Sequence, residues 1–83
     1  MKINLKLYAS LGQYLPAEAK KNEFPAKMED KATVGGVLRD YSVPGDMCHL
    51  VLVNGVFIPP SERDEYKLKD GDSLAVWPPV AGG

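Results

Sequence analysis

The sequence predicts an α+β fold, with a mixed sheet of about five strands and one main helix. Stretches near both ends alternate polar and apolar residues, the period-2 pattern of strands that are buried on one face. Between them, one stretch has apolar residues at spacings of three and four, which is typical of an amphipathic helix. With 83 residues, the chain has room for one domain with a modest core.

Residues 2–8 and 23–29 are the first two predicted strands. Apolar residues fall on one face of the first strand, namely Ile3, Leu5 and Leu7. The second strand alternates in the same way, so the two are expected to pair antiparallel as a wide hairpin. Pro25 has no N–H to donate to a ladder, which predicts an exposed edge or a bulge. The intervening residues 9–22 are expected to form a helical turn followed by a surface loop.

Residues 33–41 form the one predicted helix. Thr33 is a good N-cap. The apolar residues that follow form one stripe: Val34, Val37, Leu38 and Tyr41. Gly35 and Gly36 each cost up to about 1 kcal/mol relative to Ala in the first turn. We attribute both glycines to close packing of the helix on the sheet.

Three further strands are predicted at residues 49–53, 56–58 and 73–77. The first is an uninterrupted apolar run, as expected for a central strand. Asn54-Gly55 suits a tight hairpin turn with positive φ angles, and Asp70-Gly71-Asp72 predicts the turn before the last strand. A right-handed crossover through the helix would place the first strand beside a parallel neighbour. This order of elements predicts the β-grasp, or ubiquitin-like, architecture.

Composition narrows the classes of partner and the compartment. A formal net charge of -1 provides no long-range attraction for nucleic acid or for an anionic membrane, so we expect protein partners instead. The N-terminal MKINLKLY has no apolar signal region, and no apolar run approaches the roughly 18 residues of a membrane span. The single cysteine cannot form an intrachain disulfide. A cytoplasmic protein is expected.

Few side chains are candidates for catalysis. Cys48 and His49 are adjacent, so in an extended strand they point to opposite faces and cannot form a nucleophile–base pair. They are also too few for a metal site, and no metal is expected. Residues 61–65 (SERDE) are interpreted as a solvated surface. The chain has no phosphate-binding glycine motif, so we expect no bound nucleotide or other cofactor.

Residues 1–77 are therefore predicted to form the domain, and residues 78–83 (PPVAGG) a flexible tail. Pro78 and Pro79 favour an extended start, and the tail would reach about 20 Å. Gly82 and Gly83 lack Cβ atoms, which suits a narrow channel and leaves the Gly83 carboxylate unhindered. Activation of that carboxylate by ATP, followed by transfer of sulfur or of an amine, is the chemistry that suits such an end. The alternative is a frayed terminus.

Strand alternation also predicts a docking surface. Three aromatic residues fall on faces opposite the apolar residues beside them: Tyr8, Phe57 and Trp77. Exposed apolar groups often mark interfaces, and aromatic residues are favoured anchors there. For Tyr8, ordinary packing on the second face of the sheet is an equal alternative.

Four stretches of the chain resemble the MoaD/ThiS family of sulfur carriers. They are KLYASLGQYLP, TVGGVLRDY, VNGVFIPP and LKDGDSLAVWPPVAGG. The similarity covers essentially the whole chain. Its most specific part is the PPVAGG ending, which is closest to the small subunit of molybdopterin synthase.

The resemblance implies that an E1-like adenylyltransferase adenylates Gly83 with ATP, and that a desulfurase or rhodanese-type donor then supplies sulfur to form a thiocarboxylate. The protein would be a co-substrate, not an enzyme. Its tail would insert into the large subunit of molybdopterin synthase and give sulfur to a pterin precursor. The inserted residues would be Pro78, Pro79, Val80, Ala81 and Gly82. In the family, apolar residues matching Tyr8, Phe57 and Trp77 contact the partner enzymes.

Three alternatives remain open at this point. The sulfur acceptor could be a tungsten cofactor, a thiamine thiazole or another thiolated product. A ubiquitin-like modifier would use the same tail and the same activation, but would form isopeptide bonds with lysines. In a plain interaction domain, Gly82 and Gly83 would have no role.

Overall fold

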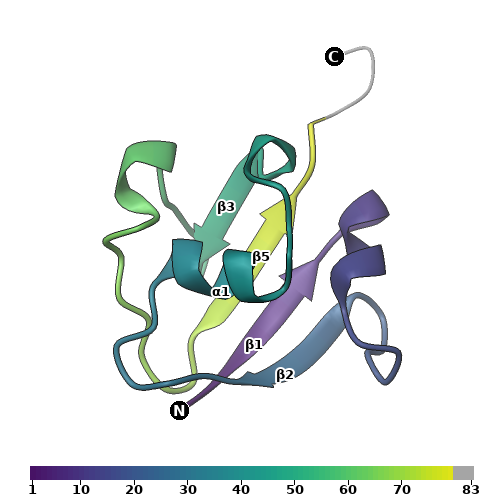
Figure 1. The fold of residues 1–83 in the computed structure, drawn as a ribbon, viewed down its shortest axis with the longest axis horizontal. Coiled ribbons are helices and arrows are strands. Elements are labelled where there is room, and N and C mark those ends of the chain that lie inside the picture. Colours follow the sequence, from purple (N-terminus) through teal and green to yellow (C-terminus); the bar gives the residue numbers. More distant parts are fainter. Residues whose placement is uncertain (80–83) are drawn as a thin grey trace.

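The computed structural model describes residues 1–79, which form one five-stranded sheet with a single α-helix against one face (Figure 1). The strands and the helix are β1 (Lys2–Leu7), β2 (Glu23–Lys27), α1 (Val34–Asp40), β3 (Leu50–Val53), β4 (Val56–Phe57) and β5 (Ser73–Trp77). Three short 3₁₀ helices are η1 (Ala9–Tyr14), η2 (Gly45–Met47) and η3 (Pro60–Glu62). Four predicted strands are one or two residues shorter than expected, and 73–77 matches.

The strand order is β2-β1-β5-β3-β4. β1 and β5 are parallel, and the other neighbours are antiparallel, so the sheet is mixed as predicted. β5 lies at the centre and β2 at an edge, which confirms the position expected from Pro25. The chain leaves β5 at the end of the sheet opposite the N-terminus (Figure 1).

The core lies between α1 and one face of the sheet. It is made of alternate strand residues and the apolar stripe of the helix. Its fully buried members include Ile3, Leu5, Leu7, Val34, Val37, Val51, Val53, Leu74 and Val76. The opposite face of the sheet, which we call the outer face, carries the other set of alternate residues.

Local signals for the helix and the hairpin are confirmed. The Thr33 hydroxyl accepts a hydrogen bond from the Gly36 N–H over 3.0 Å, which caps α1. The two-residue turn between β3 and β4 has positive φ angles at Asn54 (51°) and Gly55 (84°). Asn can adopt this conformation and Gly adopts it without steric cost.

The sheet is not the packing partner of either glycine, contrary to expectation, and a Cβ on Gly36 would meet only the Thr33 hydroxyl, at 3.1 Å. A Cβ on Gly35 would collide with the side chain of Asp64, in the segment after η3, and not with the sheet. The Gly35 N–H also donates to the Arg63 carbonyl over 2.8 Å. The glycine thus allows the η3 segment to cross the first turn of α1.

Arg63 corrects the interpretation of residues 61–65 as a solvated surface. Its side chain is buried and donates from Nη1 to the Cys48 carbonyl over 2.7 Å, and from Nε to the Ile58 carbonyl over 3.0 Å. Burial lowers the pKa of its guanidinium. The four residues beside it are exposed, as predicted. Arg63 therefore ties the η3 segment to the ends of β3 and β4.

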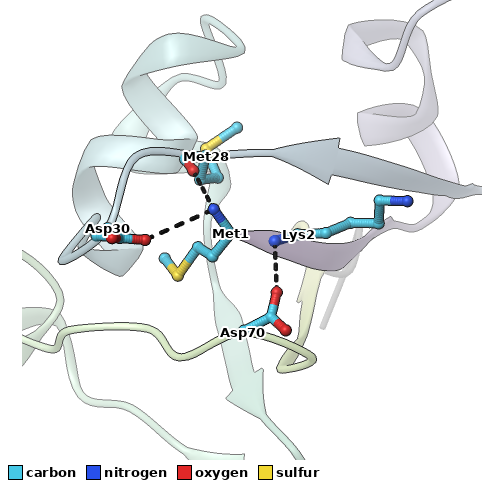
Figure 2. Close-up of polar contacts among 5 residues, drawn as sticks. All are labelled: Met1, Lys2, Met28, Asp30 and Asp70. Atoms are coloured by element: carbon cyan, nitrogen blue, oxygen red, sulfur yellow. Dashed lines mark hydrogen bonds and ion pairs between the residues drawn. The ribbon is translucent and has the colours of Figure 1, made fainter.

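The N-terminal end of β1 is held by three polar contacts (Figure 2). The Met1 ammonium donates to the Met28 carbonyl over 2.8 Å and lies 3.7 Å from an Asp30 carboxylate oxygen. The backbone N–H of Lys2 donates to Asp70 over 2.8 Å. These contacts fix the end of β1 that is remote from the tail.

Candidate functional site

The tail begins where the β5 ladder stops. The Trp77 carbonyl accepts a hydrogen bond from the His49 N–H over 3.0 Å, as the last contact between β5 and the β3 segment. Pro78 and Pro79 follow and have no N–H groups, so the ladder cannot continue. The remaining tail residues, Val80, Ala81, Gly82 and Gly83, lie outside the described residues, so the roles assigned to them remain predictions.

The ring of Tyr8 stacks on the ring of Trp77, with centroids 4.5 Å apart and planes inclined by 13°. This contact follows from the register of β1 and β5. The Tyr8 N–H donates to the Val76 carbonyl over 3.1 Å and extends the parallel pairing by one residue. Both rings are half-buried. Tyr8 therefore packs on the outer face, against the residue that precedes the tail.

The outer face carries a continuous apolar surface, which we call the outer-face patch. Register places Leu50 opposite Trp77, and places Leu52 between Ala75 and Phe57. The patch consists of Tyr8, Leu50, Leu52, Phe57, Ala75 and Trp77. Phe57 is 49% exposed and Leu50 is 36% exposed. Leu7, Ile58 and Val76 are buried, which confirms that the three aromatic residues face the other way.

Leu50 and Leu52 are members of the patch that the sequence prediction missed. The apolar run at 49–53 was interpreted as a central strand, and such a run gives no alternation to separate its two faces. The number of predicted helices could have revealed these two residues. One short helix covers only one face of a five-stranded sheet, so alternate residues of any apolar strand must lie on the uncovered face.

A shallow groove of about 460 Å³ borders the patch at the base of the tail. Its lining comes from η1, from the start of β3, from the end of β5 and from the tail: Ala9, Ser10, His49, Leu50, Trp77, Pro78 and Pro79. The groove is open and largely apolar. Aromatic and apolar surface of this kind is characteristic of the centres of protein interfaces.

The titratable side chains near the site do not form a catalytic pair. Cys48 is buried, and its Sγ donates to the Pro44 carbonyl over 3.4 Å, whereas His49 is exposed. Burial raises the pKa of the Cys48 thiol; the Arg63 guanidinium opposes this increase and the Asp46 carboxylate adds to it. Within residues 1–79, no three metal-ligating side chains lie close enough to hold an ion, and no helix is long and apolar enough to cross a membrane.

Comparison with known proteins gives one family. The model of the ThiS family matches residues 12–83, which include the tail. A comparison with curated protein sequences found no match.

Among solved structures, the HVO 2177 protein of Haloferax volcanii is 28% identical, with a TM-score of 0.77 over 100% of this chain and 87% of that one. SAMP1 from the same organism is 23% identical, with a TM-score of 0.68 over 100% of both chains. A complex of subunits 1 and 2 of molybdopterin-converting factor from Helicobacter pylori contains a chain 21% identical, with a TM-score of 0.59 over 100% of both. These similarities confirm the β-grasp fold.

Proposed function

Because the chain belongs to the ThiS family, we propose that it is a sulfur carrier that acts through the Gly83 carboxylate. An E1-like adenylyltransferase activates this carboxylate with ATP, and a desulfurase or rhodanese-type donor supplies the sulfur. The tail then enters the large subunit of molybdopterin synthase, or an equivalent acceptor enzyme, and gives its sulfur to a pterin precursor of the molybdenum or tungsten cofactor. The family match through residue 83 is the observation that supports this proposal.

The chemistry explains why the tail needs a separate activating enzyme. A carboxylate is a poor acyl donor, because its oxygen is a poor leaving group. Attack of a Gly83 oxygen on the α-phosphorus of ATP releases pyrophosphate and leaves an acyl-adenylate. Attack of the terminal sulfur of the donor's persulfide on the acyl carbon then releases AMP and leaves an acyl disulfide. A second thiol attacks the donor sulfur of this disulfide, so that a donor disulfide leaves and the thiocarboxylate is released. Inorganic sulfide would displace AMP and give the thiocarboxylate directly. ATP is bound by the partner, and we propose that the carrier itself binds no cofactor and acts in the cytoplasm as a co-substrate.

The outer-face patch is the surface that we assign to partner docking. It is contiguous with the start of the tail through Trp77, so a protein that covers the patch also lies close to the point where the tail leaves the domain. Phe57 and Leu50 are its most exposed apolar side chains. The Helicobacter pylori complex contains a structurally similar subunit bound to a second subunit, which supports docking to a large partner.

The family match alone supports a second acceptor class equally well. A carrier for thiamine thiazole or another thiolated product would use the same tail and the same activation. A ubiquitin-like modifier would also be adenylated, but its Gly83 would end in isopeptide bonds with lysines.

The acceptor to which the protein transfers its sulfur distinguishes a molybdopterin carrier from a thiazole carrier and from a protein modifier. The thiocarboxylated protein is mixed with the large subunit of molybdopterin synthase and the pterin precursor, and its intact mass is followed. We expect the mass to return to that of the carboxylate while the pterin gains sulfur. Transfer only to a thiazole synthase would identify the second acceptor. A ladder of larger conjugates, absent when Gly83 is deleted, would identify a modifier.

A further inference from the structure

The outer face has a second half, which is basic. Lys2 and Lys6 on β1 and Lys27 on β2 are the outer-face lysines. Lys2 lies opposite Lys27, and the next pair, Ile3 and Ala26, is buried in the core, so the two lysines project to the outer face. Lys6 lies opposite Ala75 of the patch. The basic half is therefore continuous with the apolar half.

The outer-face lysines form no ion pairs within residues 1–79. Glu23 lies opposite Lys6 and reduces the positive charge beside it, while its carboxylate accepts a hydrogen bond from the Asn4 side chain over 3.0 Å. Figure 2 shows the Lys2 side chain extending away from Asp70, whose carboxylate binds the Lys2 backbone.

The arrangement has a cost for the isolated protein. Like charges placed directly opposite each other on paired strands are destabilising, and Lys2 and Lys27 form such a pair. An acidic surface brought against the three ammonium groups would remove this repulsion. A net charge of -1 makes nucleic acid a poor candidate for that surface, because the rest of the chain repels it.

We propose that the activating enzyme docks across both halves of the outer face, placing an apolar surface on the patch and an acidic segment against Lys2, Lys6 and Lys27. This inference rests on the proposed function. A carrier must leave the activating enzyme after each reaction in order to reach its acceptor. Charges at the rim of an interface accelerate association and contribute less to the strength of the final complex, which suits such rapid exchange.

The test measures ATP–pyrophosphate exchange by the E1-like adenylyltransferase of the same organism, with the carrier as the varied substrate. The test variant is Lys6→Glu/Lys27→Glu. The matched control is Lys31→Glu/Lys67→Glu, which makes the same change in net charge at exposed positions in the loops before α1 and β5. Thermal unfolding confirms that each variant is folded. If the Glu variant does not fold, Lys6→Gln/Lys27→Gln replaces it.

We expect the KM for the carrier to rise about tenfold in the test variant, with little change in kcat, because rim charges act mainly on association. The KM of the wild-type protein rises with salt, and this dependence weakens in the test variant only. Equal KM values for test and control variants would overturn the inference while leaving the proposed function intact. Absence of exchange with the wild-type protein would overturn both.

Discussion

The ring of Tyr8 stacks on the ring of Trp77 with a centroid separation of 4.5 Å. Tyr8 directly follows β1 and Trp77 is the last residue of β5, so the stack joins the ends of the two central parallel strands. It also holds the indole that immediately precedes Pro78. The contact thus connects the folded domain to the point at which the tail leaves it.

Replacing Tyr8 tests this connection. We expect Tyr8→Ala to lower the free energy of unfolding by at least about 1 kcal/mol, because it removes the aromatic pair, typically worth about that much beyond simple burial, together with the buried part of the ring. The emission of Trp77, the single tryptophan of the chain, is expected to shift to longer wavelength as water reaches the indole. Tyr8→Phe keeps the ring and serves as the control. An unchanged emission spectrum in Tyr8→Ala would show that the stack does not shield Trp77.

Substitutions at Phe57 and at the neighbouring Ile58 should distinguish a role in partner docking from a role in folding. Phe57 is 49% exposed, so we expect Phe57→Ala to weaken binding of the activating enzyme by about 2 kcal/mol, as for an interface anchor, and to change stability little. Ile58 is buried, and Ile58→Ala is expected to cost about 2–5 kcal/mol of folding free energy. Calorimetric binding and urea unfolding measure the two effects. Unaltered binding by Phe57→Ala would remove Phe57 from the docking surface.

Arg63 and Arg39 provide a matched pair of arginine deletions. Arg63→Ala is expected to lower the free energy of unfolding by about 2–3 kcal/mol, because it removes charged hydrogen bonds to two buried carbonyls. Arg39 pairs with Asp64 on the surface, and such exposed pairs contribute at most about 1 kcal/mol. Urea unfolding compares the two variants at the same net charge. Similar losses in both would contradict a structural role specific to Arg63.

The raised pKa of the Cys48 thiol implies that the free energy of unfolding depends on pH. Because burial raises the pKa of the folded thiol, the folded state retains a proton that the unfolded state loses. The resulting stabilisation is fully present below about pH 8.5, the ordinary thiol pKa, and is lost as the pH rises through the raised pKa of the folded state. From about pH 7 to about pH 9, a range that includes the ordinary thiol pKa, the free energy of unfolding of the wild-type protein should fall more than that of Cys48→Ala. Parallel pH profiles would show that the thiol pKa is not raised.

The strands, the helix and the turns that were predicted correctly are those whose sequence signals lie within a few residues of one another. Alternation set the faces of β1 and β5, Thr33 marked the start of α1, and Asn54-Gly55 fixed the hairpin turn. Each of these depends on residues within a few positions of one another. The β-grasp order then followed from connection rules, which require only the sequence of elements.

The features that escaped prediction depend on contacts between distant segments. Burial of Arg63 requires carbonyls at Cys48 and Ile58 to lie within its reach, which no local pattern shows. Gly35 is required by Asp64, which is far along the chain. The stack of Tyr8 on Trp77 depends on the β1–β5 register, which was not fixed by the sequence pattern.

Whether Gly83 carries sulfur as a thiocarboxylate can be decided by one intact-mass measurement. The wild-type protein and a variant lacking Gly83 are incubated with the E1-like adenylyltransferase, ATP and a sulfide source. We expect a mass gain equal to the replacement of one oxygen by sulfur in the wild-type protein, and none in the truncated variant. No gain in the wild-type protein, with an enzyme shown to be competent on another carrier, would contradict it.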